Sequence, residues 1–531
     1  MATNAPTSFL KLAALSLATL VAAQSPTVTL DSGVYRGLAT SLPGSSVTVH
    51  KYLGIPFAEP PERFGLPQPL PPSTAVKSAE KGAPACPENT SGSMGAFGNG
   101  AATESEDCLY LNVFTPAAAL NATEKKTVMV WFFGGGLQFG SASMPGYDGT
   151  SFATNQDVVL VATNYRTNIF GFPGELPFPG LQARTSNLGF LDQRAALQWV
   201  QDNIAKFGGD PSKVTIFGES AGARSVDFHL LTTQDPPFRA VIMQSGSAHL
   251  YPGTIGAAPK KANTTAFLAV AEAVGCPNEG SEALLHCMRA VPLATLKAAV
   301  LKSPIQFGAE DDQGFTTLRD SEAARLEHRV ANVSLMIGTN ADEQKATIVR
   351  DRGLRLAAFL KKQVEDDTLR AKVAGAYKVG AEYKTEFDTM AAVATDMAFT
   401  CVTSRESRIS AQAGYPTWRF LFNASFPNSE AFNGSGAYHS SEIQYVFGNL
   451  RTPKGPSKPE EISLSKAMQT AWATFAKNPL AGPGWARVGS GNGSQELGEF
   501  NYDGKLHAKS PAFLDRHCVL FEEIVIEAAR G

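Results

Sequence analysis

The pentapeptide Gly-Glu-Ser-Ala-Gly at residues 218–222 places one hydroxyl, Ser220, between two glycines, directly after the apolar run 214–217. A serine hydroxyl becomes a useful nucleophile only when a base removes its proton. A strained turn from strand to helix exposes such a hydroxyl above a sheet edge, and only small neighbours such as Gly218 and Gly222 fit it. The motif therefore predicts a nucleophile, and a tight turn with a solvated serine is the alternative.

A second glycine-rich segment, Phe-Gly-Gly-Gly at 133–136, follows the apolar run 128–133. Acyl transfer builds negative charge on an oxygen atom, which preorganised backbone N–H groups can stabilise. Consecutive glycines let these N–H groups approach a ligand because no Cβ atom stands in the way. The segment predicts an oxyanion loop upstream of Ser220, and a flexible turn is the alternative.

A base and an acid must complete such a site, and hydrolases with this serine turn carry them in the chain order serine, acid, histidine. Three histidines lie late in the chain, at His439, His507 and His517. His517 adjoins a cysteine and His507 lies in a polar turn, so composition modestly favours His439. Asp342 and Glu343 both follow an expected strand end, and spacing does not choose between them.

The elements that must position these groups are short apolar runs that end in Gly, Ser or Asn, separated by amphipathic stretches. The expected strands lie at 128–133, 158–165, 214–217, 240–244, 334–340 and 418–422. Helices are expected at 190–207 and 461–477. This alternation predicts an α/β fold with a large, mostly parallel central sheet covered by helices on both faces. Chemistry in such sheets gathers at the carboxyl ends of the strands, where the candidate residues fall.

Composition bounds the class of protein. The chain has 531 residues, of which 43% are hydrophobic and 18% charged, with a net charge of -3. This composition supports a large packed core and excludes global disorder. The charge balance provides no basic surface for nucleic acid or an anionic membrane. No segment after the N-terminus is apolar enough to predict stable membrane insertion, and the sequence leaves the oligomeric state open.

The N-terminus is typical of a secreted protein. Lys11 is followed by the apolar stretch 12–23, and small residues favour cleavage near Ala23, so residues 1–23 are predicted to be a signal peptide and the product extracellular. Six cysteines fit an oxidising compartment, although spacing alone fixes none of their fifteen possible connectivities. Glycosylation sequons occur at Asn89, Asn121, Asn263, Asn332, Asn423, Asn433 and Asn492.

Two long segments, 207–222 and 106–116, resemble the signatures of the type-B carboxylesterase family, which includes fungal extracellular esterases and lipases and the cholinesterases. The resemblance covers roughly residues 27–525. It implies the α/β-hydrolase fold, formed as a single domain over 24–531, and ester hydrolysis without a metal or organic cofactor. A small-molecule ester is then the expected partner.

The resemblance also implies roles for individual residues. Ser220 matches the nucleophile, Glu343 the acid and His439 the general base. The remaining matches are Gly135, Gly136 and Ala221 as oxyanion donors, Ser245 as a buried support for the acid, and the disulfides Cys86–Cys108, Cys276–Cys287 and Cys401–Cys518.

Three residues depart from the family pattern: Gln344 after the acid, Ser440 after the histidine, and the charged Arg224 close behind the serine turn. None removes a catalytic group, so they bear on specificity more than on activity.

The loop between Cys86 and Cys108 is rich in Gly and Ser, without an amphipathic helix of the kind that meets a lipid interface. It also lacks tryptophan for a cation site. Short-to-medium or moderately bulky esters are therefore the predicted substrates. An interfacial triacylglycerol lipase is the alternative, and a catalytically inactive adhesion or partner-binding relative is a second one from a different class.

Overall fold

The computed structural model describes residues 25–90, 103–174, 184–248, 263–277, 282–304, 306–380, 382–450, 454–491 and 493–530. The predicted signal peptide and the centre of the Cys86–Cys108 loop lie outside these ranges. In the described part of the chain, eleven strands form one sheet in the order β14-β13-β12-β11-β10-β9-β7-β8-β6-β4-β3. A small second sheet has the order β1-β2-β5.

The strands of the large sheet are short except for β9, which leads to the serine turn. They are β3 (Leu38–Thr40), β4 (Val49–Pro56), β6 (Tyr110–Pro116), β7 (Lys126–Phe132), β8 (Val159–Thr163), β9 (Gly209–Glu219), β10 (Ala240–Gln244), β11 (Ser334–Asn340), β12 (Thr417–Asn423), β13 (Leu497–Asn501) and β14 (Leu506–Lys509). The small sheet consists of β1 (Thr27–Leu30), β2 (Gly33–Arg36) and β5 (Val76–Ser78).

The centre of the large sheet is parallel and its edges are antiparallel. Neighbouring strands from β8 through β7, β9, β10, β11 and β12 to β13 are parallel, whereas β14, β6, β4 and β3 pair in the antiparallel sense. The prediction of a mostly parallel sheet is confirmed for this centre. The carboxyl ends of β7, β9, β10 and β11 consequently meet at one edge.

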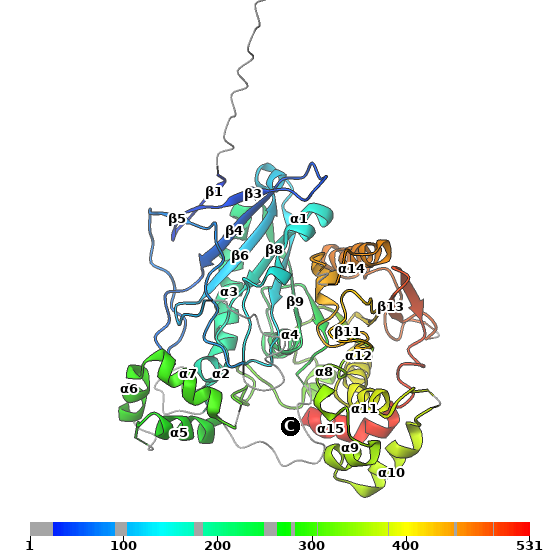
Figure 1. Cartoon of the computed structure of the whole chain (residues 1–531). Helices are drawn as coiled ribbons and strands as arrows, with labels where there is room; N and C mark the ends of the chain where they lie inside the picture. The colour runs from blue at the N-terminus through cyan, green and yellow to red at the C-terminus, as the bar shows by residue number, and fades with distance from the viewer. Residues whose placement is uncertain are drawn as a thin grey trace, which may run out of the picture.

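Helices connect the strands and cover both faces of the sheet (Figure 1). They are α1 (Thr150–Gln156), α2 (Asn168–Gly171), α3 (Leu188–Asn203), α4 (Ala221–Thr232), α5 (Asn263–Ala273), α6 (Glu282–Ala290), α7 (Leu293–Lys302), α8 (Ser321–Leu326), α9 (Leu356–Gln363), α10 (Asp367–Ala376), α11 (Glu386–Thr395), α12 (Cys401–Gln412), α13 (Ile443–Phe447), α14 (Pro459–Lys477) and α15 (Glu522–Arg530). Figure 1 shows α5, α6 and α7 gathered in one group and α9, α10, α11 and α15 in another, both at the end of the molecule away from β3 and β4.

The side chains of β7 show why both faces are covered. Val128 and Val130 pack in one apolar cluster with residues of α3 and α4, whereas Met129 and Trp131 pack in another with residues of α1 and α14. Successive side chains of a strand point to opposite faces, so a continuous apolar run needs an apolar partner layer on each side.

The two predicted long helices are confirmed within a few residues. The stretch 190–207 is α3 followed by one 3-10 turn, Ile204–Phe207, and the chain turns away at Gly208, whose φ is 84°. The stretch 461–477 is α14, which starts two residues earlier because the Glu461 carboxylate accepts the Lys458 N–H at 2.7 Å and caps the first turn.

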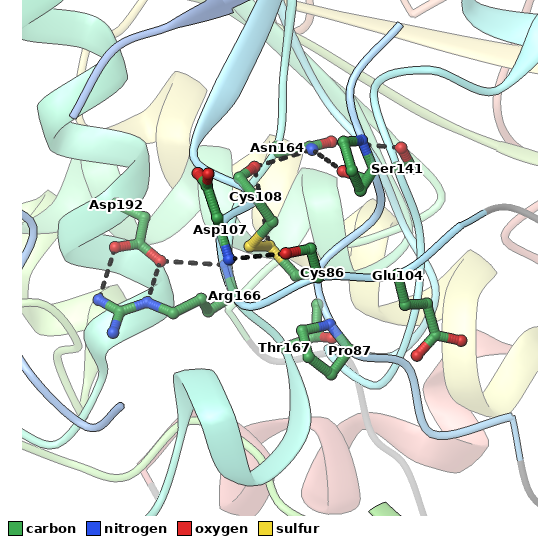
Figure 2. The surroundings of a disulfide bond; sticks show 12 residues. Cys86, Pro87, Glu104, Asp107, Cys108, Ser141, Asn164, Arg166, Thr167 and Asp192 are labelled. Atoms are coloured by element: carbon green, nitrogen blue, oxygen red, sulfur yellow. Dashed lines mark hydrogen bonds and ion pairs between the residues drawn. A yellow bond between two sulfur atoms is a disulfide. The ribbon is translucent and has the colours of Figure 1, made fainter. Parts of the chain in front are cut away.

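The three predicted disulfides are confirmed as Cys86–Cys108, Cys276–Cys287 and Cys401–Cys518. Figure 2 shows the first of them, where Asn164 Nδ2 donates to Cys108 O at 2.9 Å. The neighbouring Glu88 carboxylate accepts the Gly140 N–H at 2.9 Å. This disulfide therefore holds the base of its loop beside residues 137–140, which directly follow the three glycines.

The sequon asparagines differ in exposure. Asn121, Asn332 and Asn433 are exposed, whereas Asn423 is half-buried and its amide donates to Glu499 at 2.8 Å. The side chains of Asn263 and Asn492 lie outside the described residues. Asn89 is only 2% exposed, and its amide donates to Gln138 Oε1 at 3.3 Å, so its side chain is less accessible than those of the exposed sequon asparagines.

Within the described ranges, no single helix has the length and apolar character needed to cross a membrane. The bent pair of α6 and α7, at 106° to one another, passes the length and composition criteria only when the two are taken together.

Candidate active site

Ser220 lies at the turn between β9 and α4 with φ 56° and ψ -121°. Positive φ is strained for a residue with a Cβ atom, and the surrounding backbone holds it in place. The Ser220 N–H donates to Gln244 O at 2.8 Å. A Cβ atom at Gly222 would collide with Phe132 O, and one at Gly218 would lie 2.5 Å from the Gly222 carbonyl carbon. The strained strand-to-helix turn predicted from the glycine spacing is present.

The three-glycine segment lies against this turn. A Cβ atom at Gly134 would come within 3.1 Å of Ser220 Cβ. Gly135 and Gly136 have φ values of 101° and 64°, which glycine adopts without strain. In the described part of the chain, no hydrogen bond is found from the N–H groups of Gly135, Gly136 or Ala221. Three backbone donors close to the serine turn therefore remain available to a ligand oxygen.

His439 and Glu343 form a buried hydrogen-bonded pair. Nδ1 of His439 lies 2.6 Å from Oε2 of Glu343, and the His439 N–H donates to the Glu343 carbonyl at 3.1 Å. The other carboxylate oxygen of Glu343 accepts the Asn340 N–H at 2.7 Å. The ring of Phe399 packs over the imidazole at a centroid distance of 5.1 Å. These contacts hold the imidazole of His439 in one orientation, in which Nδ1 faces Glu343 and Nε2 is free of that carboxylate.

The structure distinguishes between the two candidate acids and the three candidate histidines that the sequence left open. Asp342 accepts the Ala437 N–H at 3.0 Å and pairs with Lys345, so it points away from the histidine. His507 is on β14 and pairs with the nearby Asp503 at 2.8 Å, and His517 lies 3.5 Å from Glu382. Of the late histidines, His439 alone contacts Glu343.

Glu219, the residue directly before Ser220, was not predicted to take part, although it lies in the serine pentapeptide. Its Oε1 is 3.2 Å from Nε2 of His439 and accepts the Ser440 hydroxyl at 2.6 Å. Ser440 has a φ of 69°, a conformation that favours glycine. Ser440, which departs from the family pattern, thus supplies a hydroxyl that holds Glu219 beside Nε2 of His439.

Burial and charge act on the pKa of His439 in opposite directions. Burial alone lowers the pKa of His439, but the carboxylates of Glu219 and Glu343 outweigh it and raise that pKa above its usual value. Burial and the neighbouring carboxylates raise the pKa of Glu219 as well. Nearby negative charges favour the protonated imidazole, which is the form that a general base takes when it has accepted a proton.

We expect Glu219→Gln to shift the acid limb of the kcat/KM profile to lower pH, by roughly one pH unit or more. For a general base at His439, this limb reports the pKa of the imidazole in the free enzyme, because only the neutral form can accept a proton. Removing a negative charge destabilises the protonated form, so the neutral form is reached at lower pH. A pH series on a 4-nitrophenyl ester measures the shift, with the exposed Glu327→Gln as control. An unmoved limb, or one moved to higher pH, would show that Glu219 does not act on His439 in this way.

Further polar groups beneath the site were also not foreseen. The Glu442 carboxylate accepts the Gln244 amide at 2.9 Å and the Asn340 amide at 2.7 Å, and it is fully buried. Ser245 is buried as expected, but within the described residues its hydroxyl has no hydrogen-bond partner, and no contact with Glu343 is found there. The backbone N–H of Asn340 occupies that role, which a side-chain pattern cannot reveal.

Comparison with known proteins assigns the chain to a family. The family model described as the carboxylesterase family matches residues 24–504. The protein belongs to the carboxylesterase family. It is thus a carboxylic ester hydrolase, and the α/β-hydrolase fold predicted from the signatures is confirmed by the mixed sheet.

Relatives from several kingdoms align with this carboxylesterase over most of its length. Carboxylesterase 1E of Mus musculus is 32% identical over 536 residues, covering 92% of this chain and 93% of its own. The para-nitrobenzyl esterase of Bacillus subtilis is 34% identical over 443 residues, with 81% and 86% covered. Secreted lipase 5 of Gibberella zeae is 32% identical over 429 residues, with 76% and 74% covered.

Proposed function

We propose that this carboxylesterase hydrolyses esters through a Ser220-His439-Glu343 triad and an acyl-enzyme intermediate. The observation that carries the proposal is the 2.6 Å contact between His439 Nδ1 and Glu343 Oε2, formed beside the strained turn that presents Ser220. The proposed oxyanion donors are the N–H groups of Gly135, Gly136 and Ala221.

In the first half of the reaction, Nε2 of His439 takes the Ser220 Oγ proton while Oγ bonds to the ester carbonyl carbon. The carbonyl oxygen becomes negative and is stabilised by the glycine-loop and α4 N–H groups. The carbon–oxygen bond to the alcohol then breaks, and the alcohol leaves with the proton from Nε2. Glu343 keeps the imidazole oriented and stabilises its charged form.

In the second half, water takes the place of the alcohol. Nε2 accepts a proton from water as the hydroxide oxygen attacks the acyl carbon, and the proton returns to Ser220 Oγ as the acid departs. Glu219 lies 3.2 Å from Nε2, so its carboxylate stabilises the imidazolium and competes for the same proton. The strength of this competition sets the pH at which the histidine becomes free to act.

The proposed substrates are short-to-medium or moderately bulky esters, and the proposed location is extracellular after removal of residues 1–23. The disulfides support an oxidising compartment, and the similar protein of Gibberella zeae is named a secreted lipase. Among the sequon asparagines whose side chains the structure describes, the exposed Asn121, Asn332 and Asn433 are best suited to carry glycans.

A series of 4-nitrophenyl esters from two to sixteen acyl carbons tests the substrate class, with emulsified triglyceride as a further arm. We expect kcat/KM to be highest for short-to-medium chains. An interfacial lipase is the second candidate, favoured by the similarity to Secreted lipase 5. A steep rate increase above the solubility limit of the substrate would support the lipase and contradict the proposed preference.

A further inference from the structure

Arg224 lies one helical turn after the proposed nucleophile and has an unusual environment. Its N–H donates to Ser220 O at 2.9 Å, which places it in the first turn of α4. Its guanidinium lies 5.3 Å from the centroid of the Phe228 ring. Nε is buried without a hydrogen-bond partner, and the side chain as a whole is half-buried. Within the described structure the guanidinium makes no hydrogen bond or ion pair.

The arginines that are almost fully buried in the described part of the chain are paired with carboxylates. Arg166 binds Asp192 through two nitrogens at 2.8 and 2.7 Å, as Figure 2 shows. Arg325 lies 2.5 Å from Glu406, and Arg419 lies 2.7 Å from Asp515. These pairs follow the general rule that a desolvated charge needs a partner.

Burial lowers the pKa of Arg224 to about 10, so the side chain remains a cation near neutral pH. A cation that is partly removed from water and lacks an anion is costly to keep in a folded protein. The Phe228 ring offsets a part of this cost through its π face. The guanidinium is therefore preorganised for an anion that the described part of the chain does not supply.

The contacts of α4 show which side of the helix Arg224 occupies. Gly222 faces the end of β7, because a Cβ atom there would collide with Phe132 O. Ser225 faces α3, where it accepts the Gln193 amide at 3.1 Å. Arg224 and Phe228, four residues apart, lie on a face of the helix that adjoins the face of Ser225.

The Phe228 side of α4 is turned toward the start of α3, where the Phe228 ring packs on Phe190 at a centroid distance of 5.4 Å. Arg224 occupies the first turn of this side, at the carboxyl edge of the sheet. Four residues of helix correspond to a rise of about 6 Å, so an arginine side chain can reach a group attached to an ester bound at Ser220.

We propose that Arg224 forms a subsite for a carboxylate carried by the ester substrate, so that the enzyme favours acidic esters over neutral ones of the same shape. This inference rests on the proposed function, because it assigns a substrate class to the Ser220 site. A guanidinium binds a carboxylate through two parallel hydrogen bonds, which lysine cannot reproduce.

Two pairs of matched esters test the subsite. On the acyl side, mono-4-nitrophenyl glutarate carries a carboxylate, and 4-nitrophenyl 5-oxohexanoate carries an acetyl group in its place. On the alcohol side, 4-acetoxybenzoate is compared with 4-acetoxyacetophenone. The measured quantity is the ratio of kcat/KM for the acidic ester to kcat/KM for its neutral partner, which cancels general changes in activity.

We expect Arg224→Met to lower this ratio at least about tenfold for one of the pairs, because a hydrogen-bonded charge pair is lost. Arg224→Lys should lower it less, and the exposed Arg329→Met should leave it unchanged. The pair that responds identifies which side of the ester carries the anion. A ratio that stays constant for both pairs, including an equal loss on acidic and neutral esters, would overturn the subsite. Wild-type protein that hydrolyses none of the four esters would instead contradict the proposed function.

Discussion

Replacing Ser220 with alanine is expected to lower kcat for ester hydrolysis by on the order of ten-thousandfold or more. The alanine methyl group fits the space of the serine side chain, so the turn between β9 and α4 keeps its backbone. Without Oγ, no acyl-enzyme can form, and only the oxyanion donors and substrate binding remain to help water attack directly. Hydrolysis of a short 4-nitrophenyl ester measures the loss, and thermal unfolding shows whether the fold is retained.

Ser490→Ala is a suitable control, because Ser490 is exposed and remote from the proposed triad in sequence. It should keep the wild-type rate. His439→Ala should approach the Ser220→Ala rate, since residues that act as one unit are not additive. A folded Ser220→Ala protein that turns over at a rate close to wild type would show that another group attacks the ester.

The largest effect on stability is expected from Arg325→Met. Arg325 is fully buried on α8 and pairs with Asp227 of α4 and with Glu406 of α12, which are also buried. Removing the cation leaves two carboxylates buried side by side, and one of them, Glu406, already has its pKa raised by burial. Breaking such a buried network by removing one partner costs about 3–5 kcal/mol. The unfolding temperature should fall clearly.

The exposed pair of Arg329 and Glu327, at 2.7 Å, provides the comparison for this effect. Arg329→Met should change the free energy of unfolding by less than about 0.5 kcal/mol, because solvent screens exposed charges. Equal unfolding temperatures for Arg325→Met and Arg329→Met would mean that the buried network does not hold α4, α8 and α12 together.

The glycine patterns could be interpreted from sequence because their requirement is local. The positive φ at Gly135 and Gly136 and the lack of space at Gly222 both favour glycine at that position, so the requirement is visible in the residue type itself. The strands that end at these segments were found for a similar reason, since an apolar run buried on both faces has a clear pattern. By contrast, β9 starts at Gly209, five residues before the apolar run, because its first residue pairs with Lys126 of β7.

The partners of the histidine could not be derived from composition. Glu343 lies 96 positions before His439 in the chain, and the choice between Asp342 and Glu343 depends on which side chain the turn after β11 directs at the imidazole. The contact of Glu219 with His439 joins the last residue of β9 to a loop residue more than two hundred positions later in the chain. Such contacts depend on tertiary packing, which residue spacing does not show. The roles of Glu343 and His439 were therefore predicted from the resemblance to a known family and not from spacing.

Covalent labelling of the nucleophile tests the proposed triad most directly. A fluorophosphonate reagent transfers its phosphonyl group to an activated hydroxyl with loss of fluoride, and peptide mass mapping locates the adduct. We expect one equivalent on the peptide that contains Ser220, a parallel loss of esterase activity, and little labelling in His439→Ala. A stoichiometric adduct on another residue, or full esterase activity in protein labelled at Ser220, would contradict the account.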